Sequence, residues 1–463
     1  MDGEAQINPF LRGNFAPIRS EDDFDLEVAG EIPAGLRGTL YRIGPNPQFE
    51  PRDPNYHWFL GDGMVHAFRV ADRKVAYRNR WVRTPRFELE RQEGRGLFGA
   101  WGNPMTTDPL ATGVDGGVAN TNIVCHAGRL LALVEGSRPF EVAQGSLDPV
   151  GYAESYKGRV TAHPKIDPET GEMVWFGYST GAMPLNNQIS YGVTAADGTV
   201  VRRDDFEAPF ASMVHDFMVT QNYALFPILP LTGSLERAMS GKPAYAWEPD
   251  KGAYVGVMRR DAGVETIRWF NAPACYVFHP MNAWEADGKV HADVMRYDAA
   301  PLFPNPDGSR GQATAARLVR WTFDLAGNSD AIKEEPLDDL DGEFPRFDER
   351  RSGLPYRHGW FAGDTHSLKT VKTNAIAHID LQTGKKAVYE LPAGDLTSEP
   401  VFTPRSESAE EGDGWLTAVV WRAAENRSDM LVFEAQDVVS GPIATAKLPR
   451  RVPFGFHGNW VAD

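Results

Sequence analysis

Short runs that alternate apolar and polar residues recur along the chain. The segment Val290–Val294 alternates strictly, which is the period of a half-buried antiparallel strand. Turn signals such as Asp197-Gly198 and Thr383-Gly384 separate these runs at short intervals. The pattern therefore predicts many short strands, among them Met64–Val70, Lys74–Val82, Glu172–Tyr178, Gly252–Met258, Lys289–Arg296, Ala375–Leu381 and Ser428–Ala435.

Helical periodicity is scarce by comparison. The best candidate is Gly233–Met239, which Pro243 soon ends. Many short strands over 463 residues predict an all-β barrel, sandwich or propeller. A seven-bladed β-propeller fits the length best, because about 66 residues per blade leave room for four strands and long loops. We expect a single domain over residues 1–463, with long loops that form a cap over one face.

Three segments between the predicted strands are unusually rich in aromatic and apolar residues: Tyr56–Leu60, Leu97–Trp101 and Leu225–Leu231. Two interpretations stay open. The segments either cap the core, or they form a substrate tunnel or a lip for transient membrane contact on one face.

Charge and cysteine content narrow the function classes. Lys and Arg number 47 against 63 Asp and Glu, a net charge of −16 with no basic tract, which argues against nucleic acid as a partner. Two cysteines, Cys125 and Cys275, cannot form a disulfide framework. The first residues do not resemble a signal peptide, and the longest uncharged stretch, Val219–Ser234, is too short and polar to span a bilayer. We therefore expect a cytoplasmic protein.

Four of the eleven histidines occur in similar settings, each in or beside a run of small, apolar or aromatic residues. They are far apart in the chain, which excludes a zinc finger or an HExxH site. Separate blades of a propeller would deliver such ligands to a central axis. All-imidazole ligation suits iron, copper or zinc, and the pattern alone does not choose among them. These four are His163, His215, His279 and His457.

The segments around these histidines, together with Gly38–Pro47 and Phe59–His66, resemble the carotenoid cleavage oxygenase family. That family includes lignostilbene and isoeugenol oxygenases, and the resemblance extends from Gly30 to Trp460. It implies a seven-bladed β-propeller with one non-haem Fe(II) per chain on the axis. No obligate protein partner is implied.

Site residues follow from the resemblance position by position. The iron ligands would be the four histidines, and three glutamates would accept the ring N–H of ligand histidines and so fix their tautomers. Thr121 matches a threonine that crowds one open iron position, whereas we expect His66 and His358 to be structural. The three glutamates are Glu135, Glu343 and Glu399, and the residues expected along a substrate tunnel are Phe59, Trp101, Val134, Phe278 and Phe303.

Cofactor motifs for other oxygenase chemistries are missing from the sequence. There is no GxGxxG after a strand and no CxxCH, so neither flavin, NAD nor haem is expected. The substrate itself would then supply the electrons. The resemblance thus implies that O2, as co-substrate, cleaves a conjugated C=C bond of an apolar small molecule into two carbonyl products.

The substrate class stays open at this point. Stilbene-cleaving relatives carry a tyrosine and a lysine that hold a para-hydroxyl, where this chain has Trp101 and Val134. These residues predict that a free para-hydroxyl is not strictly required, because a buried phenolate would lack a partner. Apocarotenoids and aryl alkenes such as lignostilbene, isoeugenol or 4-vinylguaiacol both remain candidates. A non-catalytic propeller that serves as a binding module is a distant alternative.

Overall fold

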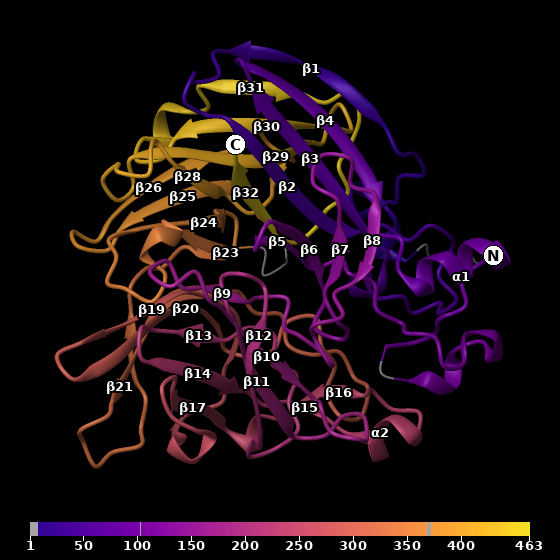
Figure 1. The fold of residues 1–463 in the computed structure, drawn as a ribbon, viewed down its shortest axis with the longest axis vertical. Coiled ribbons are helices and arrows are strands. Elements are labelled where there is room, and N and C mark those ends of the chain that lie inside the picture. The colour runs from indigo at the N-terminus through magenta and orange to yellow at the C-terminus, as the bar shows by residue number, and fades with distance from the viewer. Residues whose placement is uncertain (1–7, 102, 368–371) are drawn as a thin grey trace.

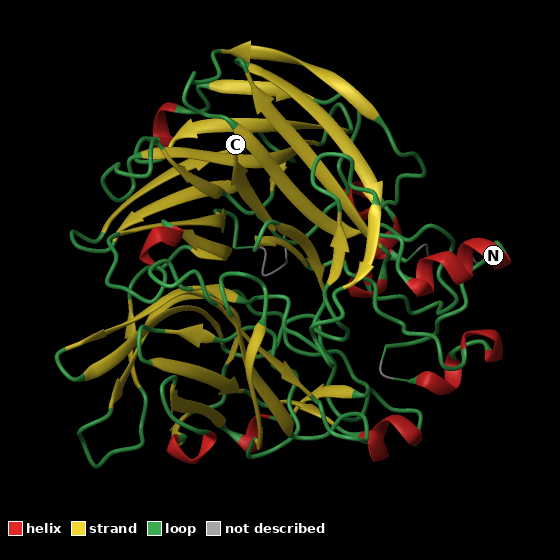
Figure 2. Cartoon of the chain, in the orientation of Figure 1, coloured by secondary structure: helices red, strands yellow, loops and turns green. Residues whose placement is uncertain are grey.

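Alternating apolar residues form β-strands where the pattern predicts them. In β20 (Lys289–Tyr297), Val290, Ala292 and Val294 are buried, and backbone hydrogen bonds join the strand to neighbours on both sides. The structure is a computed structural model that describes residues 8–101, 103–367 and 372–463. Strands predominate throughout these residues (Figures 1 and 2), and the prediction of an all-β fold is confirmed.

Five antiparallel sheets of four strands each are formed between residues 122 and 390. In each of them the strands are paired in the order in which they follow in the chain, as in the blades of a propeller. The sheets are β5 (Asn122–His126), β6 (Arg129–Leu133), β7 (Phe140–Val142) and β8 (Pro149–Tyr152); β9 (Lys165–Ile166), β10 (Met173–Tyr178), β11 (Gln188–Thr194) and β12 (Val200–Glu207); β13 (Met218–Val219), β14 (Tyr223–Ile228), β17 (Ala253–Arg259) and β18 (Arg268–Ala272); β19 (Tyr276–Ala286), β20, β21 (Arg317–Asp324) and β22 (Lys333–Pro336); and β23 (Asp341–Phe347), β24 (His358–Asp364), β25 (Ala375–Asp380) and β26 (Lys385–Glu390). A two-stranded sheet, β15 (Leu231–Gly233) with β16 (Tyr245–Trp247), lies between β14 and β17 in the chain.

The prediction of seven blades is wrong. Within the described residues the chain forms five blades, and the strands from its two ends join in a single ten-stranded sheet instead of two separate blades. Figure 1 shows these indigo and yellow strands side by side at the top of the molecule. They are β1 (Asp23–Gly30), β2 (Gly38–Pro45), β3 (Gly63–Ala71), β4 (Lys74–Trp81), β27 (Leu396–Thr397), β28 (Val401–Pro404), β29 (Gly414–Arg422), β30 (Arg427–Glu434), β31 (Ala444–Lys447) and β32 (Gly458–Ala462).

Strand β1 is the reason why the two groups of strands merge. Its first half pairs with β4, with Asp23 opposite Arg78, and its second half pairs with β31, with Glu27 opposite Lys447. At the other side of the sheet β2 pairs with β32. An equal division of the length into blades cannot reveal a strand that belongs to two ladders.

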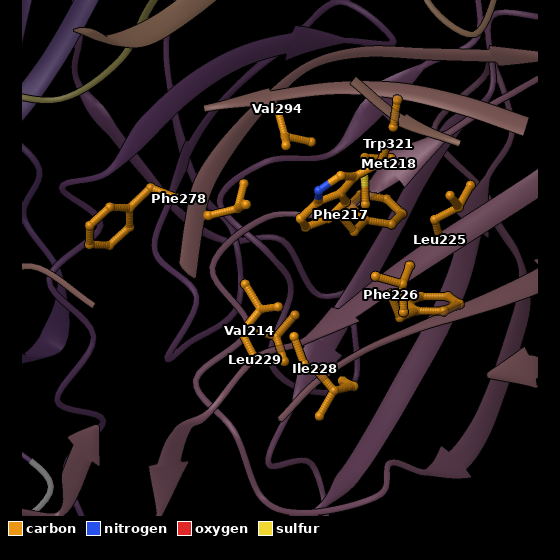
Figure 3. Packing of buried hydrophobic residues seen from close by; sticks show 14 of the residues in the cluster. Val214, Phe217, Met218, Leu225, Phe226, Ile228, Leu229, Phe278, Val294 and Trp321 are labelled. Atoms are coloured by element: carbon orange, nitrogen blue, oxygen red, sulfur yellow. The ribbon is translucent and has the colours of Figure 1, made fainter. Parts of the chain in front are cut away.

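The largest core cluster fills the space between the second, third, fourth and fifth four-stranded sheets. Phe217, Phe226 and Trp321 are fully buried in it (Figure 3). Phe278 belongs to the same cluster but lies away from these rings in Figure 3. This packing fixes the strands β13 and β19, and with them the segments around His215 and His279.

In the described ranges, two α-helices and several short 3-10 turns lie in the loops. The predicted helix is confirmed as α2 (Leu235–Met239), whereas α1 (Pro85–Glu93) was not predicted. The 3-10 turns are η1 (Pro9–Leu11), η2 (Gly13–Phe15), η3 (Trp58–Leu60), η4 (Pro104–Thr106), η5 (Pro109–Ala111), η6 (Pro249–Lys251), η7 (Val264–Thr266), η8 (Glu349–Arg351) and η9 (Val438–Ser440). No helix in the described ranges is long and apolar enough to cross a membrane.

Candidate metal centre

The four histidines singled out in the sequence meet at one point. His279 is part of β19, whereas His163, His215 and His457 lie shortly before β9, β13 and β32. One ring nitrogen of each lies within 4.8 Å of the others, and all four side chains are buried. Segments at the edge strands of four different sheets therefore bring their imidazoles together.

The ring nitrogens that face each other cannot be hydrogen-bonded in the usual way. The Nε2 atoms of His163 and His215 are 3.1 Å apart, as are those of His215 and His279, and the buried Nε2 of His457 has no partner. Three of these histidines direct Nδ1 at a carboxylate, so Nδ1 carries the proton and Nε2 presents a lone pair. Lone pairs this close repel each other unless a cation lies between them. The donor set therefore fits a metal ion.

Glutamates lie behind three of the four histidines. The Nδ1–H of His215 donates to Glu135 over 3.1 Å, and that of His279 donates to Glu343 over 2.5 Å. His457 donates to Glu399 over 2.9 Å. Such carboxylates hold the rings in place and raise their basicity toward a metal.

Glu399 is the most completely paired of the three. Its second oxygen accepts a hydrogen bond from the backbone N–H of Gly458 at 3.0 Å, and Arg346 forms an ion pair with it at 3.0 Å. Burial alone would raise the pKa of Glu399. Arg346 and His457 outweigh this effect and lower the pKa below its usual value, to about 2. This carboxylate is therefore charged at neutral pH.

His163 has a different acidic neighbour, which sequence reasoning missed. Asp216 Oδ2 lies 3.6 Å from His163 Nδ1, while Asp216 Oδ1 accepts a 2.7 Å hydrogen bond from Lys165 Nζ. Asp216 is buried. A carboxylate directly after His215 is the signal that could have drawn attention to it.

At His215 burial is outweighed by the charge and hydrogen bond of Glu135, which raise the pKa above its usual value. Burial keeps the other three imidazoles in the neutral form that binds metals. It lowers the pKa of His163 well below the usual value, and the three other histidines add to this effect. It also lowers the pKa of His279 and His457, although their glutamate partners act in the opposite direction. Neutral rings need no deprotonation before a cation enters.

Two cavities of unequal size adjoin the histidines. A cavity of about 60 Å³ is lined by Phe278, and one of about 450 Å³ is lined by Trp101 and Val134. Phe59 lines both. Phe303 lines neither, but packs behind Phe59 and Trp101 with ring centroids 6.4 and 5.5 Å away. Two aromatic residues that sequence reasoning missed, Phe344 and Phe456, also line these cavities.

Thr121 lies at the junction of the cluster and the larger cavity. Its hydroxyl donates to Asn120 Oδ1 over 2.9 Å, and its backbone carbonyl accepts from the N–H of His457. It lines the larger cavity together with His215 and Glu135. The residue is thus fixed beside the metal centre by hydrogen bonds on both sides.

The remaining sequence candidates lie elsewhere. His66 is hydrogen-bonded to the hydroxyl of Tyr77 at 2.7 Å, and His358 contacts His378 at 3.0 Å. Of the three apolar segments, residues 56–60 and 97–101 contribute to the larger cavity, whereas residues 225–228 form the buried strand β14. The last segment therefore belongs to the core and to neither a tunnel nor a lip.

Comparison with known proteins agrees with this geometry. The family described as "Retinal pigment epithelial membrane protein" matches residues 15–462. The isoeugenol monooxygenase of Pseudomonas nitroreducens is 40% identical over 98% of both chains, and the carotenoid cleavage oxygenase of Mycobacterium tuberculosis is 35% identical over 98% of this chain and 97% of its own. The chain belongs to the carotenoid cleavage oxygenase family. The crystal structure of the lignostilbene dioxygenase of Pseudomonas brassicacearum, 36% identical, aligns over 98% of this chain and 99% of its own with a TM-score of 0.94.

Membership of the carotenoid cleavage oxygenases explains the arrangement of the centre. The chain is an enzyme of the oxygenase class, and its buried four-histidine cluster is a metal site. The carboxylates beside the cluster, from three glutamates and Asp216, lie on the Nδ1 side of the imidazole rings. The atoms that face the ion are therefore imidazole nitrogens and not carboxylate oxygens.

Proposed function

We propose that this protein is a non-haem Fe(II) oxygenase that cleaves a conjugated C=C bond of a small apolar molecule with O2, giving two carbonyl products. His163, His215, His279 and His457 would hold the iron, and Glu135, Glu343 and Glu399 would orient three of them. The observation that carries the proposal is the buried all-imidazole cluster at the junction of two largely apolar cavities. We treat residues 1–463 as one catalytic domain, because the ligands come from four different sheets.

Iron is the metal that we assign to the site. Four neutral imidazoles suit several divalent ions, but zinc has no redox chemistry and structural zinc sites are closed by four ligands. Bound iron would supply the capacity to bind and activate O2. The relatives that match the whole chain are named oxygenases, which supports this choice.

The protein's own groups would position the substrate and exclude water. Phe59 lines both cavities, so its ring borders any molecule that extends from one into the other. Phe278 lies edge-on to the ring of His215, at 5.2 Å between centroids. A flat conjugated substrate held among these rings would present one double bond beside the cluster while bulk water is kept away.

An aryl alkene is the substrate class that we favour. The relatives named for isoeugenol and lignostilbene support it, the first by identity and the second by its close structural match. An apocarotenoid remains the second candidate, because Trp101 and Val134 give the larger cavity apolar walls. The two free cysteines fit a reducing compartment, and on that ground we place the enzyme in the cytoplasm.

Metal analysis and oxygen uptake test the proposal together. Protein purified without oxygen should contain about one iron per chain and consume one O2 per alkene cleaved, with no added reductant. Changing His279 to Ala should abolish both the bound iron and turnover. Stoichiometric zinc that alone supports activity, or a strict requirement for NADH, would contradict the assignment, and binding without turnover would favour a non-catalytic module.

A further inference from the structure

The two cavities at the metal centre differ in size and in chemistry. Both reach His215, Phe59 and Phe456, so they meet at the cluster. The wall of the larger cavity contains the apolar residues Trp101 and Val134. It also contains polar side chains, among them Arg159, Tyr178 and Tyr245. Trp101 and Val134 offer no partner for a substrate oxygen, whereas these polar groups do.

Arg159 is the cation of this wall that has no acidic partner. Its Nη1 donates to the carbonyl of Ser179 at 3.1 Å. Glu135 lines the same cavity, but within the described part of the chain no carboxylate lies at ion-pair distance from Arg159. Arg86 lines the same cavity but lies 3.9 Å from Asp62 and 3.8 Å from Glu90. The charge of Arg159 is thus available to a ligand, whereas that of Arg86 is already balanced.

Two tyrosines accompany Arg159 in the wall. Tyr178 ends β10 and Tyr245 begins β16, and their hydroxyl groups interact with each other. Burial and the charge of Glu135 raise the pKa of Tyr178 well above its usual value and that of Tyr245 to about 12, while Arg159 acts in the opposite direction on both. Both phenols therefore remain neutral hydrogen-bond donors close to the guanidinium. The ring of Trp101 packs on Tyr245, at 5.6 Å between centroids.

A guanidinium and phenolic hydroxyls in an apolar cavity are suited to one kind of ligand atom. They donate hydrogen bonds, so they bind an oxygen that accepts them, most strongly when it carries negative charge. Arg159 is partly buried and has no ion-pair partner in the cavity wall, so a ligand oxygen there would gain a charge-assisted hydrogen bond. The smaller cavity is lined mainly by aromatic and aliphatic residues, with Phe278 and Phe344 near the cluster.

We propose that Arg159 and Tyr245, with Tyr178 beside them, bind the phenol or phenolate oxygen of an aryl alkene. The ring would then occupy the larger cavity, its double bond would lie beside the four histidines, and a short apolar end would enter the smaller cavity. This proposal rests on the proposed function and replaces the expectation, drawn from Trp101 and Val134 alone, that a para-hydroxyl is not required.

Matched substrates and variants test these roles. Isoeugenol and its methyl ether differ only at the oxygen in question, and wild type should prefer isoeugenol in kcat/KM. Arg159→Gln and Tyr245→Phe should each lower kcat/KM for isoeugenol by about ten- to hundredfold, the loss expected for a hydrogen bond to a charged group. For the methyl ether, kcat/KM should fall less than threefold in both variants. The control is Tyr254→Phe, which changes a tyrosine of β17 outside both cavities and should lower kcat/KM no more than this for either substrate.

Equilibrium binding separates this proposal from the proposed function. Titration of anaerobic protein with isoeugenol needs no turnover, so a selective loss of affinity in Arg159→Gln supports the phenol site even if no alkene is cleaved. If Arg159→Gln lost equal affinity for isoeugenol and for its methyl ether, the proposal would be overturned. Tighter binding of 4-vinylbenzoate than of 4-vinylphenol by wild type would also overturn it. Tyr245→Phe removes one oxygen atom, and unchanged metal content and melting temperature would show that both variants are folded.

Discussion

Each histidine of the cluster uses its two ring nitrogens differently. Nε2 faces the centre and Nδ1 faces outward, where three of the rings donate to a glutamate. The carboxylates are not equivalent, because Glu399 is bound by Arg346 and Gly458 as well, whereas one oxygen of Glu135 has no hydrogen-bond partner. Removing their charges should therefore have unequal effects.

We expect Glu399→Gln to weaken metal binding by about 10–100-fold, the range known for residues that orient metal ligands. The neutral amide would leave Arg346 with only the exposed Glu349 as its counter-charge, so the melting temperature should fall too. Glu135→Gln is the matched comparison and should cost less on both counts. Competition with a chelator and thermal denaturation measure the two effects, and equal losses in the two variants would contradict this ranking.

Asp216 should act on the metal centre through His163. Asp216→Asn removes the charge that faces His163 Nδ1 at 3.6 Å, so the ring loses part of its orientation and metal affinity should fall by about tenfold. Asp293→Asn is the control, because Asp293 is also buried and pairs with Arg320, away from the cluster. Chelator competition should show lower affinity in the first variant only. An effect of equal size in the control would assign Asp216 to general stability.

The residues of the site were predictable only where a motif surrounds them. The four histidines and three glutamates lie in segments that resemble family motifs, and the structure brings them together. Arg159, Tyr178 and Tyr245 are ordinary residues in their local sequence. Their proximity depends on how β10, β16 and the segment before β9 pack, which no local pattern encodes.

At the scale of elements, strands with a clear alternation were predictable and the joining of sheets was not. Helix α1 had usable signals that were overlooked: Thr84 accepts a hydrogen bond from Phe87 N, Pro85 begins the helix, and Gly94 ends it with a φ of +69°. The double pairing of β1 could not be inferred, because its partners β4 and β31 come from opposite ends of the chain.

Helix α1 also shapes the larger cavity through Glu90. This buried carboxylate accepts hydrogen bonds from the backbone N–H groups of Leu97 and Phe98, at 2.7 and 3.1 Å, and so holds the segment that leads to Trp101. Glu90→Ala should raise KM by about tenfold or more, because hydrogen bonds to a charged acceptor are lost. Metal content should not change, and the exposed Glu93→Ala on the same helix should behave as wild type. Steady-state kinetics with metal analysis would check this, and a loss of metal would refute it.

At the scale of the whole molecule, the metal joins parts of the chain that are far apart. His163, His215 and His279 come from consecutive blades, whereas His457 adjoins β32 of the ten-stranded sheet. A ligand that binds the folded state alone stabilises it, by about 2.7 kcal/mol at a hundredfold excess over Kd. Chelation should therefore lower the melting temperature of wild type by a measurable amount. The melting temperature of His457→Ala should respond far less, and an equal response would show that the stabilising ion binds elsewhere.

The pairing of β2 with β32 and of β1 with β31 has a consequence for the order of events during synthesis. The N-terminal strands leave the ribosome first. The edges of β1 and β2 therefore have unpaired backbone groups until the C-terminal strands β31 and β32 have been synthesised. Three ligand histidines are made long before the fourth. Nascent protein thus passes through a stage in which it can neither close its largest sheet nor complete its metal site, so the metal can be fully coordinated only after translation.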